Sequence, residues 1–433
     1  MNYNKYRDIL NKMNREEINN LLDNCEREVT AQFQAIDKIK EINQEKVLNA
    51  FQKNKIGAEH FYTVSGYGHD DIGRIALDRV FADTFHAEKA IVRNHFVSGT
   101  HALACALFGN LRYGESLIYI SGRPYDTLEE VIGIRGDKRA SLIGHGVKYN
   151  EVPLKNDYEL DFDLIAKTVK PTTNMVALQR SRGYSLRKSI CIDEIKEAVR
   201  IVKSINPDCI FFTDNCYGEF AEELEPTDVG ADIIAGSLIK NPGGGIVEAG
   251  GYIAGREYFV EQAAMRLTAP GIGSKGGAMF NQHRLIFQGL FMAPGVVAEA
   301  LKGAILAAKV FEEIGFQSTP KFDEKRTDII QTITFGSPEP LINFCKALQF
   351  NSPVESYLTP VPDEVPGYDD KLIMAGGTFI EGSTIELSAD GPLRPPYSAY
   401  MQGGLNYAHV KIALREILNE IFNTEVKNEF QLH

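Results

Sequence analysis

The spacing of apolar and polar residues divides the chain into three regions. Residues 1–65 are polar, with apolar residues at helical spacing, which predicts an N-terminal helical arm. Such an arm packs either on another subunit or as an ordinary helix on the surface. Residues 66–290 alternate short apolar runs with amphipathic stretches. Pro294-Gly295 punctuates the chain near the start of residues 291–433, which predict a smaller α/β domain.

The central region predicts a mainly parallel sheet, because strands separated by helices form βαβ units with both faces of the sheet covered. The apolar runs that predict strands are Ala90–Arg93, Ser116–Ile120, Gly146–Glu151, Met175–Gln179, Cys209–Thr213, Ile233–Ser237 and Gly251–Ala254. The stretches that predict helices are Thr100–Phe108, Asp126–Ile132, Asp161–Val169, Ile192–Ile205 and the residues after Ala278, with a long helix at Val296–Gly315.

Composition excludes several classes of protein. Lys and Arg number 46 and Asp and Glu number 58 in a chain of 433 residues, so the formal net charge is −12. This balance argues against binding to nucleic acid or to an anionic membrane surface. It does not exclude a small anionic ligand in a local basic pocket.

Targeting signals and cysteines indicate the compartment. The N-terminal residues 1–17 lack the apolar core of a signal peptide. The most apolar stretch, Val296–Phe311, carries three charged residues, so no membrane span is predicted. The 6 cysteines form no Cys-x-x-Cys pair and lie mostly in apolar stretches. We therefore expect reduced thiols in a soluble cytoplasmic protein.

A lysine follows one of the predicted strands. The strand ends at Ser237, and Lys240 lies three residues further along. A glycine-rich turn, Gly243–Gly245, follows. Burial at the end of a strand is expected to lower the pKa of Lys240, as a lysine that forms a Schiff base requires. The glycines would let the main chain approach a bulky cofactor. The alternative is a surface lysine at the start of a loop.

An aspartate ends the neighbouring strand. Asp214 lies 26 residues before Lys240 and is expected at the carboxyl edge of the sheet, where open parallel sheets bind ligands. A carboxylate there can pair with a protonated pyridine nitrogen and keep the ring an electron sink. The alternatives are an Asx turn that closes the strand, or a metal or ribose ligand.

Small residues begin the first helix of the central region. Ser98-Gly99-Thr100 follow a short strand, and a helix N-terminus of this kind binds phosphate through its free N–H groups. Ser98 and Thr100 are alternatively plain N-caps. Further along, Tyr125 in Pro-Tyr-Asp either stacks on a flat ring or belongs to a turn.

A glycine-rich loop with charged residues precedes these segments. Gly66–Arg74 contains a tyrosine, Tyr67, and an arginine, Arg74, that suit an anion. His69-Asp70-Asp71 suggests a metal, but no second group of ligands accompanies it, so we expect no metal.

The order of these segments resembles the fold type I pyridoxal 5′-phosphate (PLP) enzymes, and more closely cystathionine γ-synthase, cystathionine β-lyase and methionine γ-lyase. The phosphate motif Ser-Gly-x-x-Ala of that group is matched by Ser98–Ala102, and its stacking tyrosine by Tyr125. Its Asp-Asn is matched by Asp214-Asn215, and its Ser-x-x-Lys by Ser237–Lys240. The resemblance implies a PLP-dependent transferase-like fold of the aspartate aminotransferase type. Such a fold has a large, mainly parallel seven-stranded sheet domain and a smaller α/β C-terminal domain.

A closer resemblance is to the branch known as aluminium resistance proteins or methionine γ-lyase family proteins. It rests on the motifs Gly-Tyr-Gly-x-Asp-Asp-x-Gly-Arg, Ser-Gly-Thr-His-Ala, Gln-Arg-Ser-Arg-Gly-Tyr and Asp-Gly-Pro-Leu-Arg-Pro-Pro-Tyr. They are present as Gly66–Arg74, Ser98–Ala102, Gln179–Tyr184 and Asp390–Tyr397.

The chain departs from the well-studied lyases at two places. There a tyrosine and an arginine two residues apart, from the neighbouring subunit, bind the phosphate, whereas Tyr67 and Arg74 are seven apart and both are candidates. The arginine that binds the substrate carboxylate is replaced by Glu386. Arg394 is the expected replacement.

The substrate loop also differs. The usual Ser-x-Asn-Pro is replaced by a loop that begins at Gln179 and contains Arg182, the second candidate for the substrate carboxylate. The resemblance therefore implies a more basic pocket, with a substrate that need not be that of the relatives.

The resemblance implies a PLP-dependent carbon–sulfur lyase that acts on a sulfur-containing amino acid such as cystathionine or methionine. Lys240 would hold the cofactor and then serve as general base, and Asp214 would keep the ring nitrogen protonated. Tyr125 would stack on the ring and protonate the leaving sulfur. Ser98-Gly99-Thr100 and Ser237 would hold the phosphate. An aminotransferase, or a PLP-bound regulatory or binding protein without turnover, is the alternative.

The resemblance also implies a partner. In that family each active site borrows residues from a neighbouring subunit, so a dimer is the minimum and a homotetramer is expected. The other expected partner is a small amino-acid substrate, with no nucleic acid and no membrane.

Overall fold

The computed structural model describes residues 13–364 and 370–422. The described residues form two compact units. The larger unit is Ile39–Gly295, and the smaller combines the residues up to Lys38 with those from Val296 onward. Residues 1–12, which bear on the expected lack of a signal peptide, lie outside the described residues.

A 7-stranded sheet organises the larger unit, in the order β1-β7-β6-β5-β4-β2-β3. Its strands are β1 (Lys89–Arg93), β2 (Ser116–Tyr119), β3 (Lys148–Glu151), β4 (Met175–Gln179), β5 (Ile210–Asp214), β6 (Ile233–Ser237) and β7 (Gly251–Gly255). Neighbouring strands from β3 to β6 are parallel, whereas β7 is antiparallel to both β1 and β6. The mainly parallel sheet predicted from the sequence is therefore confirmed, and each predicted strand is present with its ends shifted by two residues or fewer.

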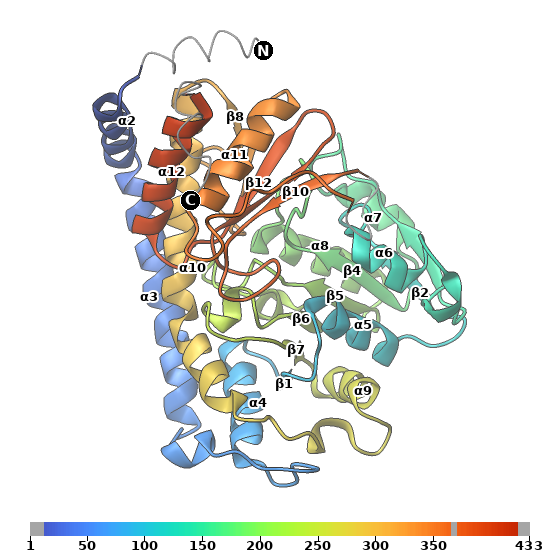
Figure 1. Ribbon diagram of the computed structural model, residues 1–433. Helices are drawn as coiled ribbons and strands as arrows, with labels where there is room; N and C mark the ends of the chain where they lie inside the picture. The colour runs from blue at the N-terminus through green and yellow to red at the C-terminus, as the bar shows by residue number, and fades with distance from the viewer. Residues whose placement is uncertain (1–12, 365–369, 423–433) are drawn as a thin grey trace. The chain divides into compact units, whose positions relative to one another are not determined.

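In the larger unit α4 precedes β1, and the helices from α5 to α9 each follow a strand of the sheet (Figure 1). They are α4 (Ile72–Thr84), α5 (Gly99–Asn110), α6 (Asp126–Ile132), α7 (Phe162–Thr168), α8 (Ile192–Ile205) and α9 (Glu257–Leu267). Short 3-10 turns are η1 (Ala58–Phe61), η2 (Lys138–Ala140), η3 (Pro226–Val229), η4 (Asn241–Gly243) and η5 (Gly273–Lys275).

Alternate strand residues and the helices α5, α6 and α9 build one core on a face of this sheet. Met175 and Ala177 of β4, and Ile210 and Phe212 of β5, are buried there with residues of α5 and α9. The spacing of two residues follows from the alternation of side chains along a strand.

The smaller unit contains a 5-stranded sheet in the order β10-β11-β12-β9-β8, antiparallel throughout. Its strands are β8 (Gln317–Thr319), β9 (Ile330–Thr334), β10 (Leu372–Ala375), β11 (Ser388–Pro392) and β12 (Ser398–Gln402). Helices α11 (Pro338–Phe350) and α12 (Tyr407–Phe422) belong to the same unit.

The start of the predicted arm is part of this smaller unit. Helix α2 (Arg15–Glu28) buries Ile18, Leu22 and Cys25 in the hydrophobic core that also contains residues of α11 and α12. Lys411 of α12 donates to Glu26 of α2 at 2.8 Å. The helical prediction is confirmed for α2, and its pattern of one buried apolar face with an otherwise mostly exposed surface is that of an ordinary surface helix packed on the core of its own unit.

Two long helices, α3 (Thr30–Lys53) and α10 (Gln282–Glu313), each continue from one unit into the other. The long helix predicted to begin at Val296 begins at Gln282 instead and runs through Pro294. The two units nevertheless divide between Gly295 and Val296, next to the predicted punctuation of the chain. A proline inside a helix costs about 3 kcal/mol. Ala293, Val297 and Leu301 around it are buried, and burial of such apolar residues offsets this cost.

Helix α10 is also long and apolar enough to cross a membrane. However, 72% of its most apolar window is buried inside the protein, as in the core helix of a globular protein.

All 6 cysteines are free thiols, and Cys191 is the one that is not fully buried.

Candidate active site

The carboxyl ends of β5 and β6 lie side by side and carry the predicted aspartate and lysine. The two strands are parallel, with Asp214 opposite Ala235. Lys240 follows β6 within a few residues, and its Nζ lies 3.9 Å from the centre of the Tyr217 ring. The Lys240 side chain is partly exposed, whereas Asp214 is buried. The topology therefore places an amine and a carboxylate at one edge of the sheet.

The charge state of Lys240 differs from the prediction. Burial lowers the pKa of Lys240, as expected, but the facing Cys216, Tyr217, Asp214 and Tyr125 groups raise that pKa, and their combined effect is larger. The pKa is therefore above its ordinary value, and the predicted lowering is wrong for the protein without a ligand. The sequence pattern shows the burial of a strand end but not the acidic groups that face it.

Asp214 is a buried carboxylate with a cation nearby. Its Oδ1 accepts the main-chain N–H of Cys216 at 3.1 Å, as in an Asx turn. Burial raises the pKa of Asp214, while Lys240 and Arg187 oppose this rise. A protonated ring nitrogen placed against this carboxylate would stabilise its ionised form, so Asp214 fits the pyridine ring of PLP.

Helix α5 begins next to the end of β6. Ser98 is its N-cap, and the Ser98 Oγ accepts from the His101 N–H at 3.1 Å. A Cβ added to Gly99 would lie 3.0 Å from the Ser237 Cβ, so glycine permits this close approach. The first N–H groups of a helix have no acceptor within it. The start of α5 thus forms a cradle that fits a phosphate, beside Ser237.

Tyr125 is held at this cradle by two contacts. Its hydroxyl lies 2.9 Å from the Thr100 Oγ1. Its main-chain N–H donates to the Gln179 Oε1 at 3.1 Å, and the Gln179 Nε2 donates to the Ser181 carbonyl at 3.0 Å. Burial raises the pKa of Tyr125, so its phenol keeps its proton. Gln179, predicted to bind substrate, links Tyr125 to the loop after β4.

Two further arginines occupy that loop. Arg182 is buried, and its Nε donates to the Ser189 Oγ at 3.3 Å. Arg187 donates to the carbonyls of Gln179 and Ser181 and acts on the charge of Asp214. The sequence motifs do not single out Arg187. The density of arginine after β4 is the signal that could have identified it.

Arg74 and Tyr67 have different environments. The Arg74 guanidinium is buried and donates to the carbonyls of Gly68 at 2.6 Å, Gly277 at 2.8 Å and Lys275 at 2.7 Å. The Tyr67 side chain is 82% exposed. Arg74 thus binds main chain of its own unit, and Tyr67 reaches solvent.

Arg394 lies in the smaller unit, after β11. It is exposed, and its Nη1 lies 3.0 Å from the Asp370 Oδ2. A substrate carboxylate would compete with Asp370 for this guanidinium, and exposed ion pairs of this kind contribute about 0–1 kcal/mol.

The His69-Asp70-Asp71 segment is arranged for structure. Asp71 caps α4 by accepting the Arg74 N–H at 3.0 Å, and both Asp71 carboxylate oxygens lie 3.0 Å from the His283 Nε2. Within residues 13–364 and 370–422, no group of three or more His, Cys, Asp or Glu side chains could hold a metal ion.

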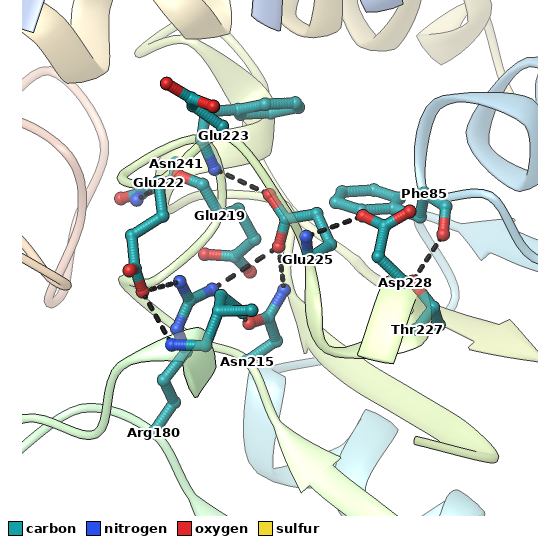
Figure 2. Close-up of polar contacts among 12 residues, drawn as sticks. Phe85, Arg180, Asn215, Glu219, Glu222, Glu223, Glu225, Thr227, Asp228 and Asn241 are labelled. Carbon is teal, nitrogen blue, oxygen red and sulfur yellow. Dashed lines mark hydrogen bonds and ion pairs between the residues drawn. The ribbon is translucent and has the colours of Figure 1, made fainter. Parts of the chain in front are cut away.

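A buried polar network lies behind the turn that follows Asp214 (Figure 2). The Arg180 Nη1 donates to the Asn215 Oδ1 at 2.9 Å, and the Arg180 Nη2 donates to the Glu222 Oε2 at 2.9 Å. The Asn215 Nδ2 donates to the Glu225 Oε2 at 3.0 Å. These contacts fix Asn215, and through it the backbone of the neighbouring Asp214. The glutamates of this network are absent from the sequence motifs.

Comparisons with known proteins agree with this geometry. The family model described as methionine gamma-lyase matches residues 18–422. An uncharacterised protein of Bacillus subtilis, YnbB, is 49% identical over 402 residues, which cover 93% of this chain and 96% of that protein.

Solved structures are also similar. One is described as a carbon–sulfur lyase involved in aluminium resistance, from Clostridium novyi. It is 48% identical, has a TM-score of 0.90, and covers 96% of this chain and 97% of that one. The PLP-dependent protein YhfS from Escherichia coli shares the fold at 16% identity, with a TM-score of 0.59 over 89% of this chain and 97% of that one.

Proposed function

We propose, on the premise that this chain belongs to the methionine γ-lyase family, that it is a PLP-dependent carbon–sulfur lyase. Its substrate would be a sulfur-containing amino acid of the cystathionine or methionine type. The observation that carries the proposal is the meeting of Lys240, Asp214 and Tyr125 at the carboxyl edge of the sheet, beside the start of α5. This arrangement offers an amine, an acid for a ring nitrogen and a phosphate cradle together.

The residues of this edge fit PLP in distinct roles. Ser98-Gly99-Thr100 and Ser237 would hold the phosphate, because the absence of a Cβ at Gly99 brings α5 and β6 together. Asp214 would pair with the ring nitrogen, and Lys240 would hold the cofactor covalently. When bound, PLP withdraws electrons from the α-carbon of an amino acid, which permits loss of a sulfur substituent.

The protein's own groups would move the protons. The Lys240 Nζ would accept the proton of the substrate α-carbon, as a general base. The Tyr125 hydroxyl would donate a proton to the leaving sulfur, and its contact with the Thr100 Oγ1 orients it. For the substrate carboxylate we propose Arg394, with Arg182 as the second candidate. A guanidinium suits this task because its fork matches a carboxylate.

The first test is the substitution Lys240→Ala, with Lys196→Ala on the exposed face of α8 as the matched control. Wild type and K196A should show the absorbance of lysine-bound PLP, and K240A should lack it. After borohydride reduction, mass spectrometry should find the cofactor on Lys240. A wild-type PLP spectrum in K240A would refute the assignment.

The reaction itself is tested by product release. The PLP-loaded wild type should release a keto acid, ammonia and a thiol from at least one member of a panel of thioether amino acids. Formation of pyridoxamine phosphate without thiol release would instead indicate an aminotransferase. Absence of turnover across the panel would contradict the lyase proposal.

A further inference from the structure

Three glutamates are buried in the segment that follows β5, and one arginine pairs with two of them. Glu219, Glu222 and Glu225 are each 3% exposed or less. The Arg180 guanidinium lies 2.9 Å from the Glu222 carboxylate and 3.4 Å from that of Glu225. Glu225 also accepts from Asn215 at 3.0 Å. Arg180 thus pairs with the carboxylates of Glu222 and Glu225, and Glu219 is the third glutamate of the segment.

Glu219 has a different set of contacts. Its Oε1 accepts from the Tyr252 hydroxyl at 2.8 Å. Its Oε2 is buried and has no hydrogen-bond partner among the described residues. A bare buried oxygen is much more costly on an ionised carboxylate than on a neutral carboxylic acid. Burial accordingly raises the pKa of Glu219 to about 8, and the nearby Glu225 charge adds to the rise.

The groups that face Glu219 come from several elements. Tyr252 of β7 keeps its own proton, because burial and Glu219 raise its pKa well above the ordinary value. The Phe85 ring is stacked on Tyr252 at 5.1 Å between ring centres, which keeps water away from the pair. After β6, the Asn241 side chain donates to the Glu219 carbonyl at 2.9 Å, and the charge of the preceding Lys240 lowers the pKa of Glu219. In the turn after β5, the charges of Asp214, Lys240 and Glu219 all act on the pKa of the Cys216 thiol.

We propose that Glu219 is a positioning residue, kept as a neutral carboxylic acid near Lys240, whose ionisation at alkaline pH makes Lys240 hold its proton more tightly. The inference rests on the proposed role of Lys240 for its functional consequence. Because Glu219 and Lys240 attract each other when both are charged, ionisation of Glu219 raises the pKa of Lys240. The neutral acid avoids this effect and still accepts the Tyr252 hydrogen bond.

The buried acid also links folding to pH. The pKa of Glu219 is raised from an ordinary value of 4.5 to about 8 in the folded protein. The folded state therefore binds about one proton more than the unfolded state between these values. Its stabilising effect is complete below the lower value and is lost as the pH rises through the higher one. The melting temperature of wild type should fall over this interval relative to that of E219Q.

The proton itself can be observed without any cofactor. The matched variants are Glu219→Gln and Glu223→Gln, since Glu223 is an exposed glutamate on the same segment. At neutral pH, infrared difference spectra should show the carbonyl stretch of a protonated buried carboxyl in wild type and E223Q but not in E219Q. The band should disappear in wild type above about pH 8. Its absence from wild type at neutral pH would overturn the inference.

The effect on Lys240 is measured on the PLP-loaded protein by absorbance as a function of pH. Wild type and E223Q should show an alkaline step that tracks the loss of the infrared band, and E219Q should lack that step. An identical profile in E219Q would overturn the coupling. Loss of PLP binding in all variants would refute the proposed function and leave the infrared result standing, so the two failures are distinguishable.

If E219Q does not fold, a second variant tests the same proposal while Glu219 stays in place. Tyr252→Phe removes the hydroxyl that lowers the pKa of Glu219 and keeps the ring that packs on Phe85. Loss of the infrared band should therefore shift to higher pH in Y252F. If the band of Y252F is lost at the same pH as that of wild type, or at a lower one, the Tyr252 hydroxyl does not stabilise ionised Glu219, and the inference is contradicted.

Discussion

Individual residues of the site show where sequence reasoning succeeds and where it stops. The positions of Lys240 and Asp214 could be predicted, because apolar runs mark strands and the polar residues after them mark the carboxyl edge. The charge state of Lys240 could not, since it depends on Cys216, Tyr217 and Tyr125, which meet only in the fold. The role of Glu219 could not be predicted either, because its hydrogen-bond partner, Tyr252, lies on β7 and meets it only in the fold.

Gly99 gives a prediction at this scale. Gly99→Ala would place a Cβ 3.0 Å from the Ser237 Cβ, so the start of α5 must move away from β6. Overpacking of this kind costs about 1–3 kcal/mol. We expect the PLP dissociation constant to rise about tenfold, since 1.4 kcal/mol corresponds to a factor of ten. Fluorescence titration with PLP measures it.

The matched control is Gly295→Ala in α10, where a Cβ would meet nothing within 4 Å. Alanine is favoured over glycine inside a helix by about 1 kcal/mol. G295A should therefore keep the PLP affinity of wild type and melt no lower. Wild-type affinity in G99A would show that the contact with Ser237 does not shape the cradle.

At the scale of elements, strands were predicted better than helix ends and interruptions. β4 and β6 match the predicted residues, because buried parallel strands are continuous apolar runs bounded by polar residues. The continuation of a helix through Pro294 was not predicted, because burial of α10 on both sides of the proline outweighs the local signal. Local preference is a weak guide wherever an element is mostly buried.

The Arg74 clamp gives a prediction at this scale, since it joins α4 to the loops at Gly68 and at Lys275–Gly277. Arg74→Ala would leave a buried carbonyl, that of Gly68, and two partly buried ones, those of Lys275 and Gly277, without this donor. We expect the free energy of unfolding to fall by about 3 kcal/mol or more. Urea denaturation of the full chain measures the loss.

Arg79→Ala is the matched control, because Arg79 is exposed on the same helix. Its effect should stay within about 0.5 kcal/mol. Equal losses in R74A and R79A would show that the hydrogen bonds of Arg74 to the three carbonyls do not account for the change.

At the scale of the whole molecule, the resemblance to the family predicted more of the architecture than the pattern of apolar and polar residues did. Alternating strands and helices predicted a parallel sheet, but the layout of the second domain and the sharing of sites between subunits came from the family. The inclusion of α2 in the smaller unit could not be predicted, because its partners in α11 and α12 lie more than 300 residues along the chain.

Assembly gives the prediction at this scale. We expect light scattering to give a mass of at least twice 48.1 kDa, and a tetramer in the PLP-loaded form. Tyr67 is the residue proposed to reach the neighbouring phosphate, since it is exposed while Arg74 is bound to its own main chain. Tyr67→Phe should weaken PLP binding without changing the mass. A monomeric protein at working concentration would contradict this proposal.

The order of the strands has a consequence for the chain as it leaves the ribosome. Lys89 of β1 pairs with Gly255 of β7, so this edge of the sheet stays open until β7 has emerged. Packing of helix α2 is delayed further, because Tyr407, which contacts Glu26 of α2, is synthesised 381 residues later. The larger unit can therefore close while the smaller one is still being made. Helix α2 is therefore synthesised early but packs late, and until it packs its apolar face is exposed to chaperones.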